Sequence, residues 1–564
     1  MEPIPKKRST TWAVSLLYSL GSGLLLWTAF PPLNIWPLAW VALVRWIWLI
    51  GRAQPLARGD YLAIWCGGFV HWLLMLQGIR LANPLLYGGW ITLSAYLACY
   101  APLFVGLARV AARPCSGAGW RLPVVVATPV VWVGLEWFRG YFVTGFSAGL
   151  LAHSQTAWPA LLQIADFSGA LGVSFLIAGT NAAIAQLLPS GTGQCGDRRA
   201  WIWPPLAATG VGLALWYGGR RLQEVPPDAD KPPLRVALIQ GSHGVRLEMT
   251  TEEYDLRMRE QVELSRQAAE QDAELDLIIW AESMFVFPDL DLVEPVYIPG
   301  DLGISPAEAL ERRELFKSQA AAAAEMWNAP RQGDKSARKT AFIFGGNTIE
   351  LGPNGDRQFN SAFLVDSQGK MMKRYDKTHA VMFGEYIPLA KQLAPGLTRR
   401  WGLPRMEEGA GPRVFAVAGW RLAPNICFES TVPHLIRGQV LVLDRNAQPP
   451  DLLINLTNDG WFWGSSILDL HLQCAVFRAI ENRRPVLIAA NTGLTAQIDG
   501  SGRILRQAPR GEPRALAVSV SADGRRAWAW NVDALGLCCA IVCGGLAAIS
   551  GYRRFTGTIP PADC

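Results

Sequence analysis

The stretch Leu422-Ala423-Pro424-Asn425-Ile426-Cys427-Phe428-Glu429-Ser430 places a cysteine directly after an apolar run that has the composition of a buried strand. Two charged residues stand in a similar position earlier in the chain, because Glu282 and Lys377 each follow a short strand-like run. Catalytic side chains often lie at strand ends, where loops can converge. An ordered glutamate, lysine and cysteine in these positions point to thiol chemistry on acyl groups.

Strand-like and helix-like segments alternate around these three residues. Thr250-x-x-Glu253 forms a capping box that predicts a helix start, and Ser367-Gln368-Gly369 predicts the turn of a hairpin. Such alternation favours a layered α/β fold. The strands are predicted at 234–240, 275–280, 341–349, 359–366, 371–375, 413–418, 422–427, 451–456, 485–490 and 495–499, with further helices at 307–327 and 467–481.

The remainder of the chain is strongly apolar. Of 564 residues, 50% are hydrophobic and only 17% are charged, and there are 24 tryptophans. This composition is too apolar for an ordinary soluble enzyme and favours membrane embedding. A single-helix span needs roughly 20 mostly apolar residues. We predict eight spans, near 11–30, 35–50, 61–78, 86–110, 122–138, 168–188, 201–218 and 533–551.

The basic residues in short loops predict the orientation of these spans. Lys and Arg are retained on the cytoplasmic side, and most of the loop arginines fall on one side if eight spans alternate, although Arg220 and Arg221 argue mildly against this. The segment between the seventh and eighth spans would then lie outside. The proline-rich linker 224–233 separates it from the helices. The predicted domains are a transmembrane domain at 1–222, a catalytic domain at 223–530, and a C-terminal transmembrane helix with a short tail at 531–564.

Charge and cysteine usage narrow the class of protein further. The net charge of +6 is explained by topology and by attraction to anionic lipid head groups, and no motif for nucleic-acid binding is evident. No CxxC pair or histidine-rich spacing predicts a metal site, and no disulfide framework is expected. In the predicted external domain, Cys474 has the helical spacing of a core residue and leaves Cys427 as the candidate nucleophile.

The types of the three residues suggest their roles. A cysteine attacks a carbonyl as a thiolate. Glu282 follows an apolar strand, where a carboxylate can have a raised pKa and accept the thiol proton. Lys377 could stabilise the negative charge that develops on the acyl oxygen. Each residue alone has a simpler explanation, since a cysteine is usually a core residue and strand-end charges usually lie at the surface.

Three motifs resemble those of a known superfamily and favour the catalytic interpretation. They look like the catalytic motifs of the nitrilase, or carbon–nitrogen hydrolase, superfamily, which implies an α-β-β-α sandwich. The motifs are Ile278-Ile279-Trp280-Ala281-Glu282-Ser283, Tyr375-Asp376-Lys377-Thr378-His379 followed by Phe383-Gly384-Glu385-Tyr386-Ile387-Pro388, and Ile426-Cys427-Phe428-Glu429.

The whole chain resembles more narrowly the apolipoprotein N-acyltransferase family, from about residue 11 to 551. Thr457-Asn458-Asp459-Gly460-Trp461-Phe462 and Asn491-Thr492-Gly493 are similar to signatures of that family, as are Phe30-Pro31-Pro32 and Glu136-Trp137-Phe138-Arg139-Gly140 in the apolar part. Ser242-His243-Gly244 departs from the family, which usually has Asn/Asp-Ile-Pro there.

The resemblance implies roles for individual residues. Glu282 would be the general base, Lys377 the oxyanion stabiliser, Cys427 the nucleophile and Glu385 a second catalytic carboxylate. The substrate-binding residues would be Asn360, Phe428 and Glu429.

The resemblance also implies a reaction and a location. An acyl chain would pass from a phospholipid such as phosphatidylethanolamine to Cys427, and from the thioester to the N-terminal amine of a diacylglyceryl-cysteine on an apolipoprotein. No cofactor or metal is implied. The enzyme would be a multi-pass protein of the bacterial inner membrane with its catalytic domain on the periplasmic face.

Two alternatives stay open at this point. In a membrane-tethered nitrilase-type amidase or hydrolase, water rather than an amine would resolve the thioester. In a noncatalytic membrane scaffold, the domain would keep its fold without turning over a substrate.

Overall fold

The computed structural model describes residues 9–555 apart from 53, 83, 85, 113–121, 189–197, 229, 246–249, 286, 299–302, 330–338, 354, 383, 388–404 and 529–532. The chain divides into two compact units. The first comprises residues 1–224, 465–473 and 527–564, and we call it the helical unit. The second comprises residues 225–464 and 474–526, and we call it the sandwich unit.

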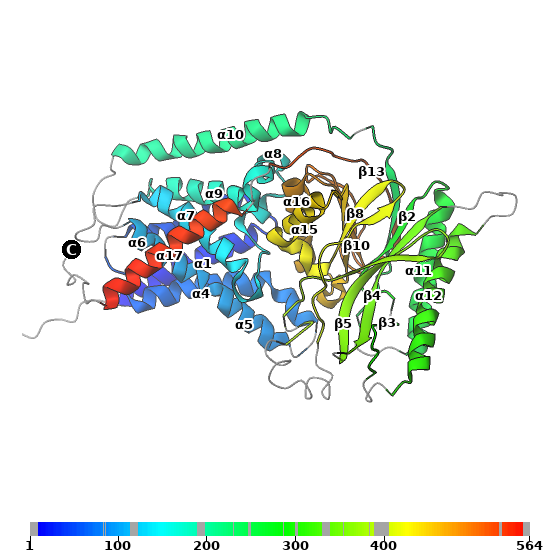
Figure 1. The fold of residues 1–564 in the computed structure, drawn as a ribbon. Coiled ribbons are helices and arrows are strands. Elements are labelled where there is room, and N and C mark those ends of the chain that lie inside the picture. Colours follow the sequence, from blue (N-terminus) through cyan, green and yellow to red (C-terminus); the bar gives the residue numbers. More distant parts are fainter. Residues whose placement is uncertain are drawn as a thin grey trace, which may run out of the picture. The chain divides into compact units, whose positions relative to one another are not determined.

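The helical unit consists of helices and short 3-10 turns (Figure 1). Its α-helices are α1 (Ser9–Thr28), α2 (Ala39–Ala42), α3 (Val44–Gly51), α4 (Arg58–Met75), α5 (Leu86–Ala98), α6 (Tyr100–Ala112), α7 (Val124–Arg139), α8 (Pro159–Leu162), α9 (Ala165–Ala185), α10 (Trp203–Gln223) and α17 (Ala534–Phe555). Its 3-10 helices are η1 (Trp36–Leu38), η2 (Gln77–Leu81), η3 (Phe142–Thr144), η4 (Leu151–Gln155) and η5 (Arg198–Ile202).

Small residues allow α1 and α4 of this unit to pack closely. A Cβ atom added to Gly23 of α1 would lie 2.1 Å from the carbonyl oxygen of Gly67 in α4. A Cβ atom added to Gly67 would in turn lie 2.2 Å from the carbonyl oxygen of Ser19. Backbones that approach this closely are typical of helix packing in membranes, where small residues form the interface.

All eight predicted spans are mainly helical, but not every one of these helices is long and apolar enough to cross a membrane by itself. Among the described residues, two helical segments are long and apolar enough to cross a membrane, namely Leu86–Ala112 and Ala165–Ala185. Shorter apolar helices cover Trp12–Thr28, Trp36–Gly51 and Ala534–Ser550. The predicted span at 35–50 is divided among η1, α2 and α3. The structure therefore bears out the helices, and the number of crossings stays a prediction.

The described strands of the sandwich unit form two β-sheets. The strands are β1 (Leu234–Gln240), β2 (Leu277–Trp280), β3 (Asp289–Leu292), β4 (Ala341–Gly352), β5 (Gly355–Val365), β6 (Met371–Asp376), β7 (Phe415–Val417), β8 (Trp420–Ile426), β9 (Leu452–Thr457), β10 (Val486–Ala490), β11 (Ala496–Ile498), β12 (Ile504–Gln507) and β13 (Arg514–Val520). The first sheet has the order β13-β1-β2-β4-β5-β6, with β3 beside β4, and the second has the order β12-β11-β10-β9-β8-β7. In each sheet the central strands run parallel and the outer strands antiparallel, except that β3 runs parallel to β4.

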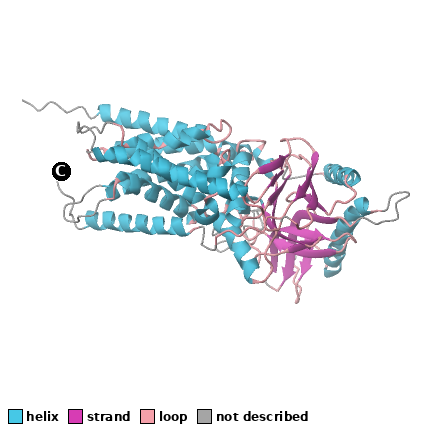
Figure 2. Ribbon diagram, turned by 90° about the horizontal axis from the view of Figure 1, so that it is seen from above, coloured by secondary structure: helices cyan, strands magenta, loops and turns pink. Residues whose placement is uncertain are grey.

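Alternating side chains build the layers of this unit. Along β1, Leu234, Val236 and Leu238 join a core shared with the second sheet, whereas Ala237 and Ile239 pack in a separate core with helices α11 (Thr251–Gln271) and α12 (Pro306–Asn328). This period of two is the direct result of strand geometry. Helices α15 (Pro433–Arg445) and α16 (Ile467–Asn482), of which residues 474–482 belong to the unit, flank the second sheet, and Figure 2 shows the strands gathered in this unit. The result is the predicted α-β-β-α sandwich.

The local predictions in this unit are largely confirmed. Thr250 and Glu253 form the predicted capping box at the start of α11, and β5 and β6 form the predicted hairpin. Helix α15 and the strands β3, β12 and β13 were not predicted from the sequence. The omission of β13 matters most, because this strand pairs with β1 along its whole length.

Candidate active site

Three charged or polar side chains from the first sheet and Glu385, in a turn further along the chain, meet in one largely buried cluster. Glu282 follows β2, Asn360 lies in β5, and Lys377 directly follows β6. The Nζ atom of Lys377 lies 2.8 Å from Oε1 of Glu385 and 3.9 Å from Oε1 of Glu282. The amide of Asn360 donates to both carboxylates, at 2.7 Å to Glu282 and 3.0 Å to Glu385. One lysine and one amide therefore hold two carboxylates together.

The second sheet supplies the cysteine. Cys427 directly follows β8 and has a φ of 53°, which places it in the left-handed region. Such a conformation is costly for a residue other than glycine and often marks a functional site. The side-chain amide of Asn455 in β9 donates to the carbonyl oxygen of Cys427 at 3.0 Å. The half-buried thiol interacts electrostatically with Glu282 and Lys377, so the structure brings the three predicted residues together.

A backbone group fixes the other oxygen of Glu282. Its Oε2 atom accepts a hydrogen bond of 2.8 Å from the backbone N–H of Asn458, which follows β9. The carboxylate is therefore held by a side chain of the first sheet at one oxygen and by the backbone of the second sheet at the other. This arrangement aligns Glu282 with the strand that also supports Cys427.

Burial and charge set the protonation states in this cluster. Burial raises the pKa of Glu282 above its ordinary value, and neighbouring Glu385 adds to this, although the charge of Lys377 opposes it. Burial also raises the pKa of the Cys427 thiol well above its ordinary value, with a further contribution from Glu282. Burial alone would lower the pKa of Lys377, but the nearby groups of Cys427, Glu282 and Glu385 raise it overall. The resting site thus favours a neutral thiol, a charged lysine and a carboxylate with raised proton affinity, which suits general-base activation of the thiol.

The carboxylate of Glu429 has a different set of hydrogen-bond donors from that of Glu282. Its buried carboxylate accepts hydrogen bonds from the hydroxyl groups of Tyr375 and Thr378 and from the backbone N–H groups of Thr378, His379 and Ile426. These groups flank Lys377 on one side and Cys427 on the other. Glu429 therefore links the ends of β6 and β8. Phe428, beside it, stacks on His379 with ring centroids 6.1 Å apart.

Several residues that support this site have no role predicted from the sequence. Asn455, Asn458 and Asn491 all belong to it or to its immediate support, and only the family-like motifs at 457–462 and 491–493 drew attention to two of them. Of the predicted motif around Glu385, Phe383 and Pro388 lie outside the described residues. Cys474 is fully buried, as predicted for a core residue.

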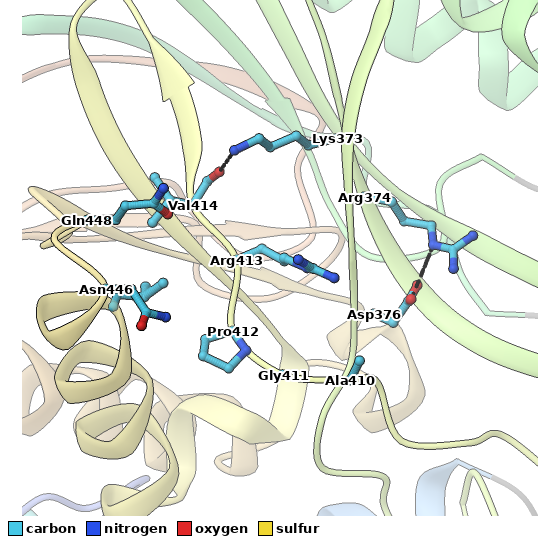
Figure 3. A pocket seen from close by; sticks show the side chains of 11 residues that line it. Lys373, Arg374, Asp376, Ala410, Gly411, Pro412, Arg413, Val414, Asn446 and Gln448 are labelled. Carbon is cyan, nitrogen blue, oxygen red and sulfur yellow. Dashed lines mark hydrogen bonds and ion pairs between the residues drawn. The ribbon is translucent and has the colours of Figure 1, made fainter.

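A cavity of about 520 Å³ lies beside β6 (Figure 3). Its lining includes Lys373, Arg374, Asp376 and Arg413, and Lys373 donates to the carbonyl oxygen of Val414 at 2.9 Å. The lining mixes these charged side chains with the apolar Ala410, Pro412, Val414 and Leu443. Neither Cys427 nor Lys377 lines the cavity.

The two-sheet fold is that of the carbon–nitrogen hydrolase class. Residues 235–529 match the family model described as carbon-nitrogen hydrolase, and residues 22–183 match the apolipoprotein N-acyltransferase N-terminal domain. The chain belongs to the apolipoprotein N-acyltransferase family.

Similar proteins cover nearly the whole chain. It is 31% identical to an apolipoprotein N-acyltransferase of Rhodopirellula baltica, over 92% of this chain and 94% of that protein. It is also 31% identical to the one of Geobacter metallireducens, over 87% of each. Among solved structures, an amidase from a Nesterenkonia species has 19% identity and a TM-score of 0.34, covering 53% of this chain and 94% of that one.

Proposed function

We propose that the protein transfers an acyl chain from a phospholipid to the N-terminal amine of a diacylglyceryl-cysteine on apolipoproteins, through a thioester on Cys427. The observation that carries this proposal is the buried cluster in which Lys377 lies between Glu282 and Glu385 and the thiol interacts with both Lys377 and Glu282. The likeness to apolipoprotein N-acyltransferases along nearly the whole chain supports the choice of substrates.

The first half-reaction forms the thioester. The sulfur of Cys427 attacks the ester carbonyl of the phospholipid while Glu282 takes the thiol proton. Lys377 stabilises the oxyanion, because an ammonium group fixed in a buried site needs no reorganisation when charge develops. The tetrahedral intermediate then collapses, the bond to the glycerol oxygen breaks, and Glu282 returns its proton to the leaving lysophospholipid.

The second half-reaction passes the chain to an amine. The α-amino nitrogen of the acceptor attacks the thioester carbonyl and gives its proton to Glu282. The bond to sulfur breaks, the proton moves to the sulfur, and Cys427 is restored. Both halves need one group that accepts and then returns a proton, and a carboxylate with a raised pKa is suited to that task.

The remaining predicted residues act around these three. We assign Glu385 to fixing the Lys377 ammonium, given the distance of 2.8 Å, and Asn360 to orienting both carboxylates. Phe428 would contact substrate beside the nucleophile. Glu429, whose oxygens are occupied by five protein donors, would act on substrate binding by holding the ends of β6 and β8.

Lipid substrates account for the helical unit. Each buried methylene contributes about 0.8 kcal/mol, so moving an acyl chain of about sixteen carbons into water would cost on the order of 12 kcal/mol. We assign eight membrane spans to residues 1–222 and 531–564 and the chemistry to 223–530, on the periplasmic face of the inner membrane. The orientation can be tested with a single cysteine placed at exposed Leu256 in otherwise cysteine-free protein. We expect a membrane-impermeant thiol reagent to label this cysteine in intact spheroplasts.

The decisive experiment is mass spectrometry of the purified protein after exposure to phosphatidylethanolamine. We expect one hydroxylamine-sensitive acyl group on the peptide that contains Cys427, and none in Cys427→Ala. Cys474→Ala provides a matched control, because this buried cysteine has no predicted part in the chemistry. An unmodified wild-type protein would contradict the proposal and support a noncatalytic scaffold.

A hydrolase is the second candidate, favoured by the carbon–nitrogen hydrolase model that matches residues 235–529. Addition of a diacylglyceryl peptide to the acylated protein separates the two. We expect N-acyl peptide to form as the thioester disappears. Free fatty acid without N-acyl peptide would reject the transferase and support hydrolysis.

A further inference from the structure

Asn491, directly after β10, uses its entire side-chain amide within the protein. Its Nδ2 group donates to the carbonyl oxygen of His243 at 2.7 Å and to Oδ1 of Asn458 at 3.0 Å. Its Oδ1 atom accepts from the backbone N–H of His243 at 3.0 Å. The residue is 1% exposed, so these bonds are shielded from water.

The backbone of Asn491 adds two further bonds at the same place. Its carbonyl oxygen accepts from the N–H of Ser242 at 2.8 Å, and its N–H donates to the carbonyl oxygen of Thr457 at 3.1 Å. Asn491 thus joins the loop after β1 to the end of β9. These two strands belong to different sheets.

The chain of bonds continues from Asn491 to the general base. Asn458 receives the amide of Asn491 on its side chain and presents its own backbone N–H to Oε2 of Glu282 at 2.8 Å. Asn458 also accepts from the N–H of Gly460 at 3.4 Å, which is the weaker of its two side-chain bonds. The side chain of Asn458 is therefore held mainly by Asn491, while its backbone follows directly from the paired end of β9.

We propose that Asn491 is a positioning residue for Glu282, and that it acts by fixing the backbone N–H of Asn458 that orients the carboxylate toward Cys427. The inference rests on the proposed function, in which Glu282 is the general base. Both N–H groups and the oxygen of the amide are needed, so an isosteric aspartate cannot replace it.

Asn491 bonds the loop after β1 through backbone groups of that loop. These groups are the N–H of Ser242 and the N–H and carbonyl oxygen of His243. The support for Glu282 is therefore insensitive to the side chains in that loop.

The test compares Asn491→Ala with a control that has the same bonding pattern elsewhere. The amide of Asn328 donates to the carbonyl oxygens of Ala324 and Thr340 and accepts from the N–H of Thr340, and it is also buried. We expect Asn491→Ala to slow Cys427 acylation by phosphatidylethanolamine by about tenfold to a hundredfold, the scale of a misplaced catalytic group. Asn491→Ala and Asn328→Ala should lower the melting temperature by similar amounts, because each loses a buried amide with the same number of bonds. Asn328→Ala should nevertheless leave the acylation rate of the folded protein within about twofold of wild type.

The pH profile supplies a readout that a purely structural role would not move. The N–H of Asn458 favours the charged form of Glu282 and so lowers its pKa. Loosening this bond should therefore move the acid limb of the acylation rate to higher pH in Asn491→Ala and not in Asn328→Ala. The double variant Asn458→Ala/Asn491→Ala should be no slower than the slower single variant, because the two residues act in series. Equal behaviour of Asn491→Ala and Asn328→Ala in rate and pH profile would overturn the proposal.

A second probe keeps the inference independent of the lipid reaction. Alkylation of Cys427 by iodoacetamide, followed across pH by mass spectrometry of its peptide, reports the coupled titration of thiol and Glu282 without any substrate. We expect the profile of Asn491→Ala to shift and that of Asn328→Ala to match wild type. Absence of lipid acylation in wild type would reject the proposed function alone, whereas an unshifted alkylation profile in Asn491→Ala would reject the positioning role alone.

Discussion

Two regions of the sandwich unit each contain a buried glutamate, and the two are bonded in opposite ways. Glu429 accepts hydrogen bonds from five protein donors. Among the described residues, Glu282 accepts from two, Asn360 and Asn458, with Lys377 3.9 Å away. A carboxylate offers about four lone-pair sites, so Glu429 has no capacity left and Glu282 does. A general base needs a free lone pair to accept a proton, and a carboxylate that only links strands does not. The difference in bonding therefore suits Glu282 to proton transfer and Glu429 to a structural role.

The largest effect is expected from Glu282→Gln. An amide of the same size cannot accept the thiol proton, so the rate of Cys427 acylation should fall by about 10²- to 10⁴-fold. The fold should persist with a lower melting temperature, because one of the two donors to this carboxylate, Asn360 or Asn458, would lose its acceptor at about 1–3 kcal/mol. Stopped-time mass spectrometry of the Cys427 peptide measures the rate, and circular dichroism during heating measures the melting temperature. Glu314→Gln, exposed on α12, is the matched control. A near-normal acylation rate in Glu282→Gln would remove the base from the mechanism.

Glu429→Gln should show the reverse balance. Five donors would meet an amide that accepts at one atom only, which leaves buried N–H groups unpaired at about 1–3 kcal/mol for each lost partner. We expect the free energy of unfolding of the sandwich unit to fall by about 2–4 kcal/mol, seen as an earlier melting transition. A melting temperature equal to wild type would show that this carboxylate is not a framework link.

Part of this site follows from sequence alone, because local patterns place its residues. Glu282 follows a run of apolar residues that is fully buried in β2, and Cys427 follows β8 in the same way. The strands and their ends could thus be predicted, and the family-like motifs indicated that Glu282 and Lys377 are the charged residues that meet at the site. The buried layers followed from the same alternation of side chains.

The supporting bonds could not be predicted, because they use groups that every residue has. The donor to Oε2 of Glu282 is a backbone N–H, contributed by a residue 176 positions further along the chain. No side-chain type signals such a bond. The strand β13 was missed for a related reason, since much of Arg514–Val520 is exposed or half-buried and the strand is defined mainly by its pairing with the distant β1.

The pH dependence of acylation gives a finer test of the Glu282 region. Glu282 must be deprotonated to act, so the rate falls as pH drops through its pKa in the folded protein. An exposed glutamate has a pKa of about 4.3. Burial raises the pKa of Glu282, with a contribution from Glu385, so the acid limb of the acylation rate should lie at a higher pH than that value. Glu385→Gln removes a like charge and should move the limb to lower pH. Rate measurements between about pH 4 and 8 would check the direction, and a limb that moves upward would show that Glu385 acts chiefly through Lys377.

Tyr375→Phe should produce the smallest change and tests the framework most selectively. It removes one of the five donors to Glu429 and leaves four, so the free energy of unfolding should fall by only about 1 kcal/mol. The acylation rate of the folded protein should stay within about twofold of wild type, because the groups next to Lys377 and Cys427 keep their bonds to the carboxylate. Tyr254→Phe, on α11, is the matched control for loss of a tyrosine hydroxyl in a buried residue. If Tyr375→Phe instead slowed acylation as strongly as Glu282→Gln, without a change in melting, the two regions would belong to one catalytic unit and the division between them would be wrong.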